Sequence, residues 1–248
     1  MLTIRRATPS DAIAIAALVR ESFRPADLDL TIYGCAGIAA YLAMQFALPP
    51  TFSPSAYLVA ETANRIAGFV EMRARENGLC LNYIATSPAC RGAGVARELL
   101  AVALRALQPP ADAAFTLDVF EHNQIALDWY RRMGFRPIEH LAFWQFSPPS
   151  ATNTAEQVRI LDLPQADVTH GAFGFSSFHL VHDGRTFPIG RLGDRWFRIT
   201  ESELLRRTAA LRALHSLDPH REFLFFGAGQ ETAGLSPLLR SIRMKRQL

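Results

Sequence analysis

The 248-residue sequence has few cysteines, a single lysine and no long apolar run. Its three cysteines, Cys35, Cys80 and Cys90, are odd in number and lack metal-ligand spacing, which favours a reduced, cytoplasmic setting over a disulfide framework. No stretch approaches the roughly 18 uninterrupted apolar residues of a membrane span. The first residues also show no small-residue cleavage site of a signal peptide. We therefore expect a cytoplasmic protein with no membrane partner.

The balance of charge is weak. There are 26 basic and 23 acidic residues, which leave a net charge of +3, and Lys245 is the only lysine. This excess is too small to predict binding to nucleic acid. Hydrophobic residues make up 49% of the chain. The chain can therefore bury a core, and its length allows one large domain or two small ones.

A polar segment with two prolines divides the sequence. It runs from Ser147 to Thr154 and has no hydrophobic periodicity, so we interpret it as a linker. We expect one domain over residues 1–147 and another over residues 155–248.

Strand and helix patterns alternate before the linker. The expected strands cover residues 2–6, 57–61, 66–74, 79–86, 114–120, 135–140 and 141–146. The expected helices cover residues 8–23, 31–46 with a break, 95–107 and 124–133. Strands separated by helices predict a layered α/β domain.

Hairpins dominate the expected pattern after the linker. The expected strands cover residues 172–182, 185–191, 195–199 and 221–226. Asp183-Gly184 and Gly193-Asp194 have the composition of hairpin turns. A capping pattern at Thr200 predicts a helix through His215, and the tail from Arg240 is either a last strand or a loose basic end. This pattern predicts a smaller α+β domain.

The most informative segment is a glycine-rich turn between the expected strand at 79–86 and the expected helix at 95–107. It reads Cys-Arg-Gly-Ala-Gly-Val-Ala-Arg from Cys90 to Arg97. A helix N-terminus has unpaired backbone N–H groups and partial positive charge. Glycines let that backbone approach an anion, so the turn is suited to a pyrophosphate. Taken alone, the turn is a weak signal, and an ordinary strand-to-helix turn is the alternative.

Two other phosphate-binding patterns fit this turn less well. Gly92-Ala-Gly94 begins the G-x-G of a dinucleotide-binding turn, but Arg97 stands in place of the third glycine. The turn also follows several other elements, whereas the dinucleotide-binding turn belongs to an opening β-α unit. The G-x-x-x-x-G-K-[ST] pattern of a P-loop does not occur in the sequence.

Two segments resemble motifs of the GNAT superfamily of acetyltransferases. Arg91-Gly-Ala-Gly-Val-Ala96 is similar to its acetyl-CoA-binding motif, (Gln/Arg)-x-x-Gly-x-(Gly/Ala). Leu117–Phe135 is similar to a later motif of the family, carried here by Asn123, Ala126, Tyr130, Gly134 and Phe135. The resemblance covers residues 1–147. It implies a GNAT-like α/β fold, with a mixed, mainly antiparallel sheet flanked by helices, followed by the smaller α+β domain.

The resemblance implies acetyl-CoA as the cosubstrate and no metal. The backbone at Ile84 and Thr86 would pair with the amides of the pantetheine arm. Asn123 joins the cofactor-binding set through the later motif. The backbone N–H groups that would hold the pyrophosphate belong to Arg91, Gly92, Ala93, Gly94, Val95 and Ala96.

The same resemblance implies roles in catalysis. Tyr130 would be the general acid, because a phenol with an ordinary pKa near 10 can protonate a leaving thiolate. Asp118 stands where some protein N-terminal acetyltransferases carry a catalytic Glu, and is the first candidate for the base. Glu71, Glu121 and a chain of waters remain alternatives. Cys90 has no recognisable base beside it, which favours direct transfer in a ternary complex over a cysteine intermediate.

We therefore expect an N-acetyltransferase acting on a primary amine of a small molecule or peptide, with the acceptor near residues 25–52. The alternative of a different class is a non-catalytic CoA-binding sensor or scaffold, and nucleic-acid binding ranks third. His179 and His182, three residues apart in an expected strand, would face opposite sides, which argues against a metal site with His170. Residues 155–248 would cover the acceptor site, form a homodimer or be a decayed copy of the same fold.

Overall fold

The computed structural model describes residues 2–63, 65–76, 78–110, 112–147, 157–228 and 236–248. Its contacts divide the chain into two compact units. Unit 1 comprises Met1–Leu28, Ile38–Glu139 and Ser241–Leu248, and unit 2 comprises Asp29–Gly37 and His140–Arg240. The linker expected at residues 147–154 lies outside the described residues apart from Ser147.

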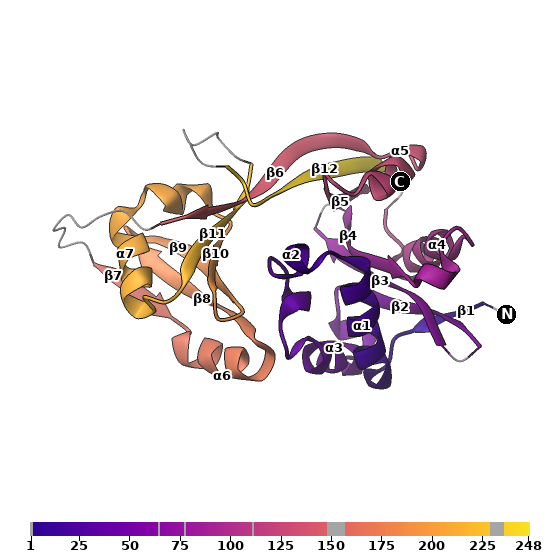
Figure 1. Cartoon of the computed structure of the whole chain (residues 1–248), viewed down its shortest axis with the longest axis horizontal. Helices are drawn as coiled ribbons and strands as arrows, with labels where there is room; N and C mark the ends of the chain where they lie inside the picture. The colour runs from indigo at the N-terminus through magenta and orange to yellow at the C-terminus, as the bar shows by residue number, and fades with distance from the viewer. Residues whose placement is uncertain (1, 64, 77, 111, 148–156, 229–235) are drawn as a thin grey trace. The chain divides into compact units, whose positions relative to one another are not determined.

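Unit 1 is a mixed sheet whose strands follow the order β1-β2-β3-β4-β5-β12 (Figure 1). The strands are β1 (Thr3–Arg6), β2 (Ser55–Thr62), β3 (Arg65–Arg75), β4 (Gly78–Thr86), β5 (Ala114–Phe120) and, from Ser241, β12 (Leu239–Gln247). Neighbouring strands are antiparallel, except that β4 and β5 are parallel. This confirms the expected mixed, mainly antiparallel sheet of the first domain.

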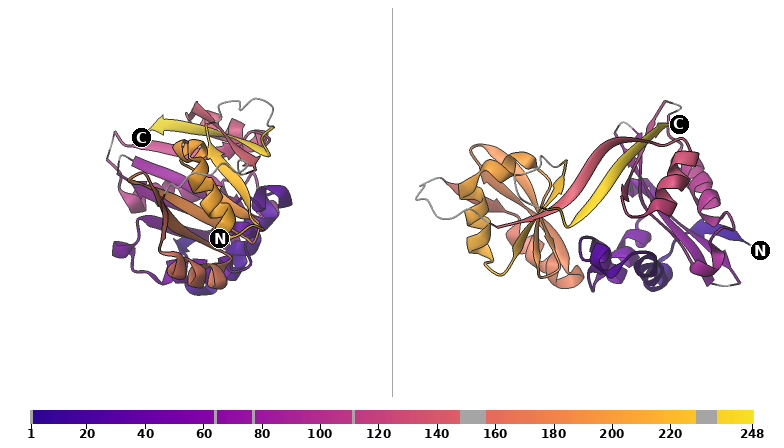
Figure 2. Two further views of the ribbon diagram at one scale, coloured as in Figure 1. Left: turned by 90° about the vertical axis from the view of Figure 1, so that its left-hand side faces the viewer. Right: turned by 45° about the horizontal axis from the view of Figure 1, so that its top comes forward.

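Helices cover both faces of the unit 1 sheet (Figure 2). On one face, α4 (Val95–Leu107) and α5 (Gln124–Arg132) bury Leu99, Leu100 and Leu127 against the strands. The other face carries α1 (Ala12–Ser22) and α3 (Ile38–Ala47), where Phe46 of α3 contacts the rings of Tyr57 and Phe69. The remaining helical turns are η1 (Pro9–Asp11), α2 (Pro25–Leu28), η3 (Pro50–Phe52) and η4 (Pro88–Cys90).

The strands of unit 2 are also mixed in direction and follow the order β6-β11-β10-β9-β8-β7. Its elements are η2 (Ile32–Gly34), β6 (Arg136–Phe146) from His140, β7 (Val158–Leu161), α6 (Leu163–Phe173), β8 (Phe175–His182), β9 (Arg185–Leu192), β10 (Trp196–Ile199), η5 (Ser202–Arg206), α7 (Thr208–Leu217) and β11 (Glu222–Gly227). β10 and β11 are parallel, and the other neighbouring strands of this unit are antiparallel. Its core is rich in phenylalanine, with Phe178, Phe187, Phe197 and Phe223 fully buried.

The two units repeat one topology. In unit 1, four antiparallel strands lead through α4 to the parallel strand β5; in unit 2, β7 to β10 lead through η5 and α7 to the parallel strand β11. The strand that then pairs with β5 is β12, from the end of the chain, and the strand that pairs with β11 is β6. Of the three roles left open for residues 155–248, a second copy of the same fold is the one that this topology supports.

Several elements differ from the sequence-based expectation. Residues 163–173 form helix α6, which ends inside the strand expected at 172–182, so that β8 begins at Phe175. The sequence did not indicate this helix, because only Ala166 in it is buried and no apolar stripe marks it. Residues 136–146 form one strand rather than two. The helix expected from Thr200 to His215 breaks at Arg207 into η5 and α7. The tail is the strand β12, not a loose end.

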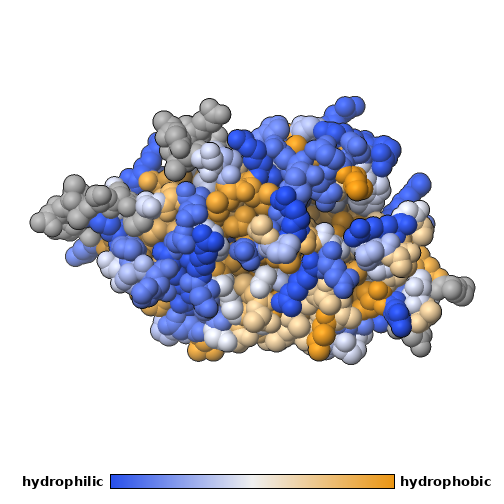
Figure 3. Space-filling view, viewed as in Figure 1, coloured by the Kyte–Doolittle hydropathy of each residue, from blue (hydrophilic) through white to orange (hydrophobic). Residues whose placement is uncertain are grey.

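The surface mixes polar and apolar side chains. Figure 3 shows hydrophilic and hydrophobic residues interspersed over the face that it draws. The most exposed apolar side chains, Ile13, Phe52, Ile125 and Val168, belong to four different helices. No helix formed by the described residues is long and apolar enough to cross a membrane.

Candidate functional site

The site is built on a fork between the two parallel strands of unit 1. β4 and β5 pair only over their first residues, from Gly78 opposite Ala114 to Leu81 opposite Leu117. Beyond this point the two strands continue without pairing to each other, β4 to Thr86 and β5 to Phe120. Ile84 and Thr86 pair with β3 on their other side. The edge of β4 that faces β5 therefore presents backbone amides to which no strand is paired among the described residues. An amide-bearing chain can pair with such an edge.

A bulge in β4 lies at the base of this fork. Glu71 of β3 pairs with Tyr83, and the next residue, Met72, pairs with Leu81, so Asn82 is an extra residue in β4. A bulge ends regular pairing and redirects the side chains beyond it. Ile84 then contacts the core beneath α4 and α5. Strand alternation consequently puts Tyr83 on the face that carries α1 and α3.

The glycine turn opens α4 directly after β4. Gly92 and Gly94 have positive φ angles of 77° and 81°, and a Cβ atom built on either would meet no atom within 4 Å. Gly94 is the N-cap of α4, and no side chain caps this helix end. Arg91 to Gly94 are exposed. The turn therefore offers uncapped N–H groups and a bare backbone approach to an anion, as the sequence predicted.

Tyr130 lies in the core on the α5 side of the fork. Its side chain is 6% exposed, and its ring contacts Trp129 and Phe135 at centroid distances of 5.0 and 5.8 Å. Burial raises the pKa of its phenol well above the ordinary value. The hydroxyl therefore keeps its proton throughout the neutral range, which is the state that a general acid needs.

Asn123, from the same motif, is the N-cap of α5. Its side-chain oxygen accepts a hydrogen bond from the backbone N–H of Ala126 at 3.1 Å. This contact explains the spacing of Asn123 and Ala126 in the motif, because an N-cap oxygen reaches the third residue of the helix. Any contribution of Asn123 to cofactor binding stays a prediction.

Asp118 projects from β5 on the face opposite Leu117 and Val119, which enter the α4–α5 core. Both of its carboxylate oxygens accept hydrogen bonds from Arg243 of β12, at 2.9 and 3.1 Å. Arg243 also donates to Glu139. The first candidate for the base is thus engaged by a guanidinium, a partner that lies 125 residues away and that no local pattern could indicate.

Glu71, one of the alternative bases, is buried on the α1–α3 face. Its carboxylate pairs with Arg73 at 2.6 Å and is 3% exposed. Its cross-strand neighbours are Tyr57 and Tyr83. Burial, with the nearby Glu71 charge, raises the pKa of Tyr57 to about 12. Glu121, the other carboxylate considered, lies in the turn after β5 and is half-buried.

The sequence-based reasoning missed a polar cluster that joins α2 to the turn after β5. His122 lies with Nε2 3.1 Å from Asp27 and Nδ1 2.9 Å from Arg24. Arg24 and Asp27 also form a salt bridge at 2.7 Å. Asp27 falls in the region where we expected the acceptor. The pairing with His122 could not be read from the sequence, because Arg24 and His122 are 98 residues apart.

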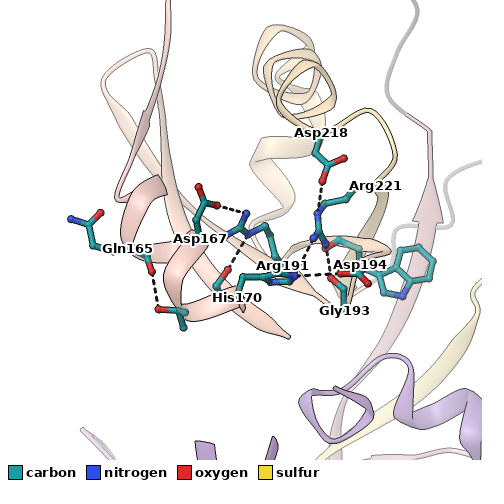
Figure 4. Close-up of polar contacts among 11 residues, drawn as sticks. Gln165, Asp167, His170, Arg191, Gly193, Asp194, Asp218 and Arg221 are labelled. Carbon is teal, nitrogen blue, oxygen red and sulfur yellow. Dashed lines mark hydrogen bonds and ion pairs between the residues drawn. The ribbon is translucent and has the colours of Figure 1, made fainter. Parts of the chain in front are cut away.

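Unit 2 has its own polar cluster, around Arg221 (Figure 4). Arg221 donates to the carbonyl of Gly193 at 2.6 Å, to Asp218 at 2.9 Å and to Nε2 of His170 at 3.2 Å. These contacts tie the β9–β10 turn to α6 and to the residues before β11. His170, considered above as a metal ligand, has a guanidinium against its ring nitrogen instead.

The other two histidines considered for a metal are separated. His179 is exposed and pairs with Asp162, while His182 is buried. Their opposite orientation on β8 is confirmed by this difference in exposure. Within the described ranges, no three His, Cys, Asp or Glu side chains gather in a way that could hold a metal ion.

The segment of unit 2 that corresponds in topology to the glycine turn is Thr200–Arg207, between β10 and α7. It contains no glycine, and it carries Glu201 and Glu203. Glu203 pairs with Arg207 at 2.6 Å and also with Arg185. Carboxylates here would repel a pyrophosphate, and no residue of this segment has a positive φ angle. Unit 2 thus lacks the features that suit unit 1 to an anion.

Comparisons with known proteins agree with this description. Residues 53–137 match a family model described as an acetyltransferase (GNAT) domain, which confirms the resemblance seen in the sequence and identifies this segment as an acetyltransferase domain of that family. No curated protein matches the sequence.

Solved structures match the whole chain. A GCN5-related N-acetyltransferase from Sphaerobacter thermophilus is 15% identical, with a TM-score of 0.63 over 99% of this chain and 95% of that one. A tandem GNAT protein from the clavulanic acid biosynthesis pathway is 12% identical, with a TM-score of 0.67 over 100% of this chain and 98% of that one. At these identities the likeness shows the fold alone, which is mixed α/β in two GNAT-like halves.

Proposed function

We propose that the protein is an N-acetyltransferase that moves an acetyl group from acetyl-CoA directly to a primary amine, with its single donor site in unit 1. The observation that carries this proposal is the uncapped glycine turn at α4, which directly follows the unpaired edge of β4. A CoA molecule has a pyrophosphate and an amide-bearing arm joined in that order. The turn and the strand edge supply partners for the two parts in the same order.

The predicted cofactor-binding residues of β4 and of the glycine turn have a physical task in this proposal. The backbone N–H groups from Arg91 to Ala96 would hold the pyrophosphate. The backbone of Ile84 and Thr86 would pair with the pantetheine amides along the free edge of β4. When bound, acetyl-CoA supplies an activated thioester carbonyl. The protonated Tyr130 would then donate its proton to the sulfur that leaves.

The assay that tests the proposal is release of free CoA thiol from acetyl-CoA in the presence of different amines. The panel contains small amines, amino acids, peptide N-termini and lysine peptides. We expect release that depends on one class of amine. Tight binding of acetyl-CoA without release across the panel would favour the alternative function, a CoA-binding sensor or scaffold.

Gly94→Ala tests the turn itself. The positive φ of Gly94 disfavours a side chain by roughly 1–2 kcal/mol, and the added methyl would occupy the open space beside the turn. We expect the Kd for acetyl-CoA to rise about 10- to 100-fold, equivalent to the loss of charge-assisted hydrogen bonds worth ~1.5–3 kcal/mol. The measurement is calorimetric titration with acetyl-CoA.

The matched control is Gly184→Ala in the β8–β9 turn of unit 2. Gly184 also has a positive φ, of 70°, and open space at the Cβ position. It should lose similar stability without any change in Kd. Equal Kd values for the two variants would show that the glycine turn does not hold the cosubstrate.

Calorimetry also tests how many donor sites the chain has. Because Thr200–Arg207 has no glycine and carries two carboxylates, we expect one acetyl-CoA to bind per chain. A stoichiometry of two would mean that unit 2 retains a donor site despite these differences.

A further inference from the structure

The ring of His122 is held between a buried carboxylate and an exposed guanidinium. Nε2 lies 3.1 Å from Oδ2 of Asp27, whose side chain is 2% exposed. Nδ1 lies 2.9 Å from Nη2 of Arg24, whose side chain is 55% exposed. The His122 side chain is 32% exposed. One nitrogen thus faces the protein interior and the other faces a side chain that can move into solvent.

These partners fix the tautomer of the ring. A guanidinium only donates hydrogen bonds, so Nδ1 must accept and carries the lone pair. The proton of the neutral ring is then on Nε2 and is donated to Asp27. A carboxylate that holds one ring nitrogen while the other accepts is the arrangement that orients a histidine base.

Aromatic contacts locate this ring at the open end of the fork. His122 stacks on Phe120, the last residue of β5, with centroids 5.6 Å apart and planes 16° apart. Phe23 contacts Phe120 edge-on at 6.0 Å and Tyr83 of β4 at 6.3 Å. Phe120 alternates with Val119, which enters the α4–α5 core. The cluster therefore lies on the face of α1 and α2, opposite the face on which Tyr130 is buried.

We propose that His122 is the general base of the transfer, taking the proton of the acceptor ammonium at Nδ1, and that Asp27 positions the ring and stabilises its protonated form. This inference rests on the proposed acetyltransferase function. The freed amine lone pair forms the N–C bond at the thioester carbonyl, the C–S bond breaks, and the leaving thiolate takes the proton of Tyr130. The nitrogen loses its second proton as the amide forms, and this proton restores the Tyr130 phenol through solvent. The proton held by His122 is lost to solvent.

The contact with Arg24 indicates how an amine would reach Nδ1. The lone pair there already accepts from a cationic N–H donor, and an acceptor ammonium is another such donor. Nη2 of Arg24 can turn away from Nδ1 while Nε keeps its bonds to Asp27, at 3.1 and 3.3 Å. The charges of Arg24 and Asp27 cancel, so the cluster does not repel a cation. Glu121, next to His122 in the chain, adds a negative charge nearby.

The carboxylates considered from the sequence are less free to act. Asp118 gives both oxygens to Arg243. Glu71 is buried and paired with Arg73. Both carboxylates are thus already held by a guanidinium. His122 needs only the departure of one exposed side chain.

His122→Gln is the first test. The glutamine amide can accept from Arg24 and donate to Asp27, so the local contacts can persist while the titrating group is lost. With the best amine, kcat/KM at neutral pH should fall about 10²–10⁴-fold. The acid limb of the pH–rate profile should disappear, and the Kd for acetyl-CoA should stay unchanged. For His122→Ala, added imidazole should restore part of the rate.

The matched control is His179→Gln in unit 2, which removes another histidine paired with a carboxylate, Asp162 at 2.8 Å, and should keep the wild-type profile. Asp27→Asn should lower kcat, because the imidazolium that forms during the transfer loses its counter-charge. Wild-type rate and acid limb in His122→Gln would overturn the inference alone. Absence of amine-dependent CoA release by the wild-type protein would overturn the proposed function with it.

Discussion

Replacing Tyr130 by Phe is expected to lower kcat by about 10²–10⁴-fold and to leave the Kd for acetyl-CoA nearly unchanged. The substitution removes one hydroxyl from a ring that is otherwise held by Trp129 and Phe135. The ring keeps its packing, so α5 should keep its position. What is lost is the proton donor for the leaving thiolate. Single-turnover thiol release and calorimetry separate the two quantities.

The pH dependence of the wild-type protein gives a second measure of this role. Burial raises the pKa of Tyr130. The phenol therefore remains protonated past the ordinary value of about 10, so kcat should not fall through loss of this proton as the pH rises to that point. A decline in kcat between neutral pH and about 10 that is absent in Tyr130→Phe would contradict the raised pKa.

Ser176→Ala is the control for the loss of a buried hydroxyl. Ser176 is 8% exposed and lies on β8 of unit 2. Its substitution should affect stability and not kcat. If Tyr130→Phe turns over like the wild type, Tyr130 is not the acid; if it loses acetyl-CoA binding, its hydroxyl has a structural role instead.

The parts of the site that depend on neighbouring residues could be predicted from the sequence. The turn at Arg91–Ala96 is local, because the glycines and the helix start lie within a few residues of one another. The cap at Asn123 is also local, although we expected Asn123 to bind the cofactor and did not predict this cap. The role of Ile84 and Thr86 was implied by the family resemblance, and the free edge at these residues depends on where β5 stops pairing with β4. Local features such as the turn are where the sequence predicts the structure best.

The remaining parts depend on contacts between distant residues. The pairing of Arg243 with Asp118 and that of His122 with Arg24 and Asp27 join segments about a hundred residues apart or more. Helix α6 was missed for a different reason, because it buries only Ala166 and so carries no hydrophobic stripe. The sequence did not decide whether the tail is a strand or a loose end, because a short strand pattern does not indicate which other strand it pairs with.

That tail is an integral part of unit 1. From Ser241 to Gln247, β12 pairs with β5 along the whole strand. Ile242 and Met244 enter the same core as Tyr130. Ser241 donates to the carbonyl of Val119 at 3.0 Å, and Arg246 lies over the rings of Phe115 and Phe135. The strand therefore supports both β5 and the segment that carries Tyr130.

Deletion of Ser241–Leu248 is accordingly expected to abolish acetyl-CoA binding, although the deleted residues lie far in sequence from both motifs. It would expose the edge of β5 and remove two buried side chains from the core. Met244→Ala is the graded form of this test. Met244 is 0% exposed, and its truncation should lower the free energy of unfolding by about 2–5 kcal/mol, a large part of the ~5–15 kcal/mol of a typical domain.

Met44→Ala is the matched control, because Met44 is 54% exposed on α3 of the same unit and should change the unfolding free energy by less than about 0.5 kcal/mol. Denaturant unfolding followed by circular dichroism measures both variants. If β12 were only a loose end, the deletion would leave acetyl-CoA binding intact and Met244→Ala would resemble Met44→Ala. A loss confined to Met244→Ala and the deletion would show that the donor site in the first half of the sequence depends on the last strand of the chain.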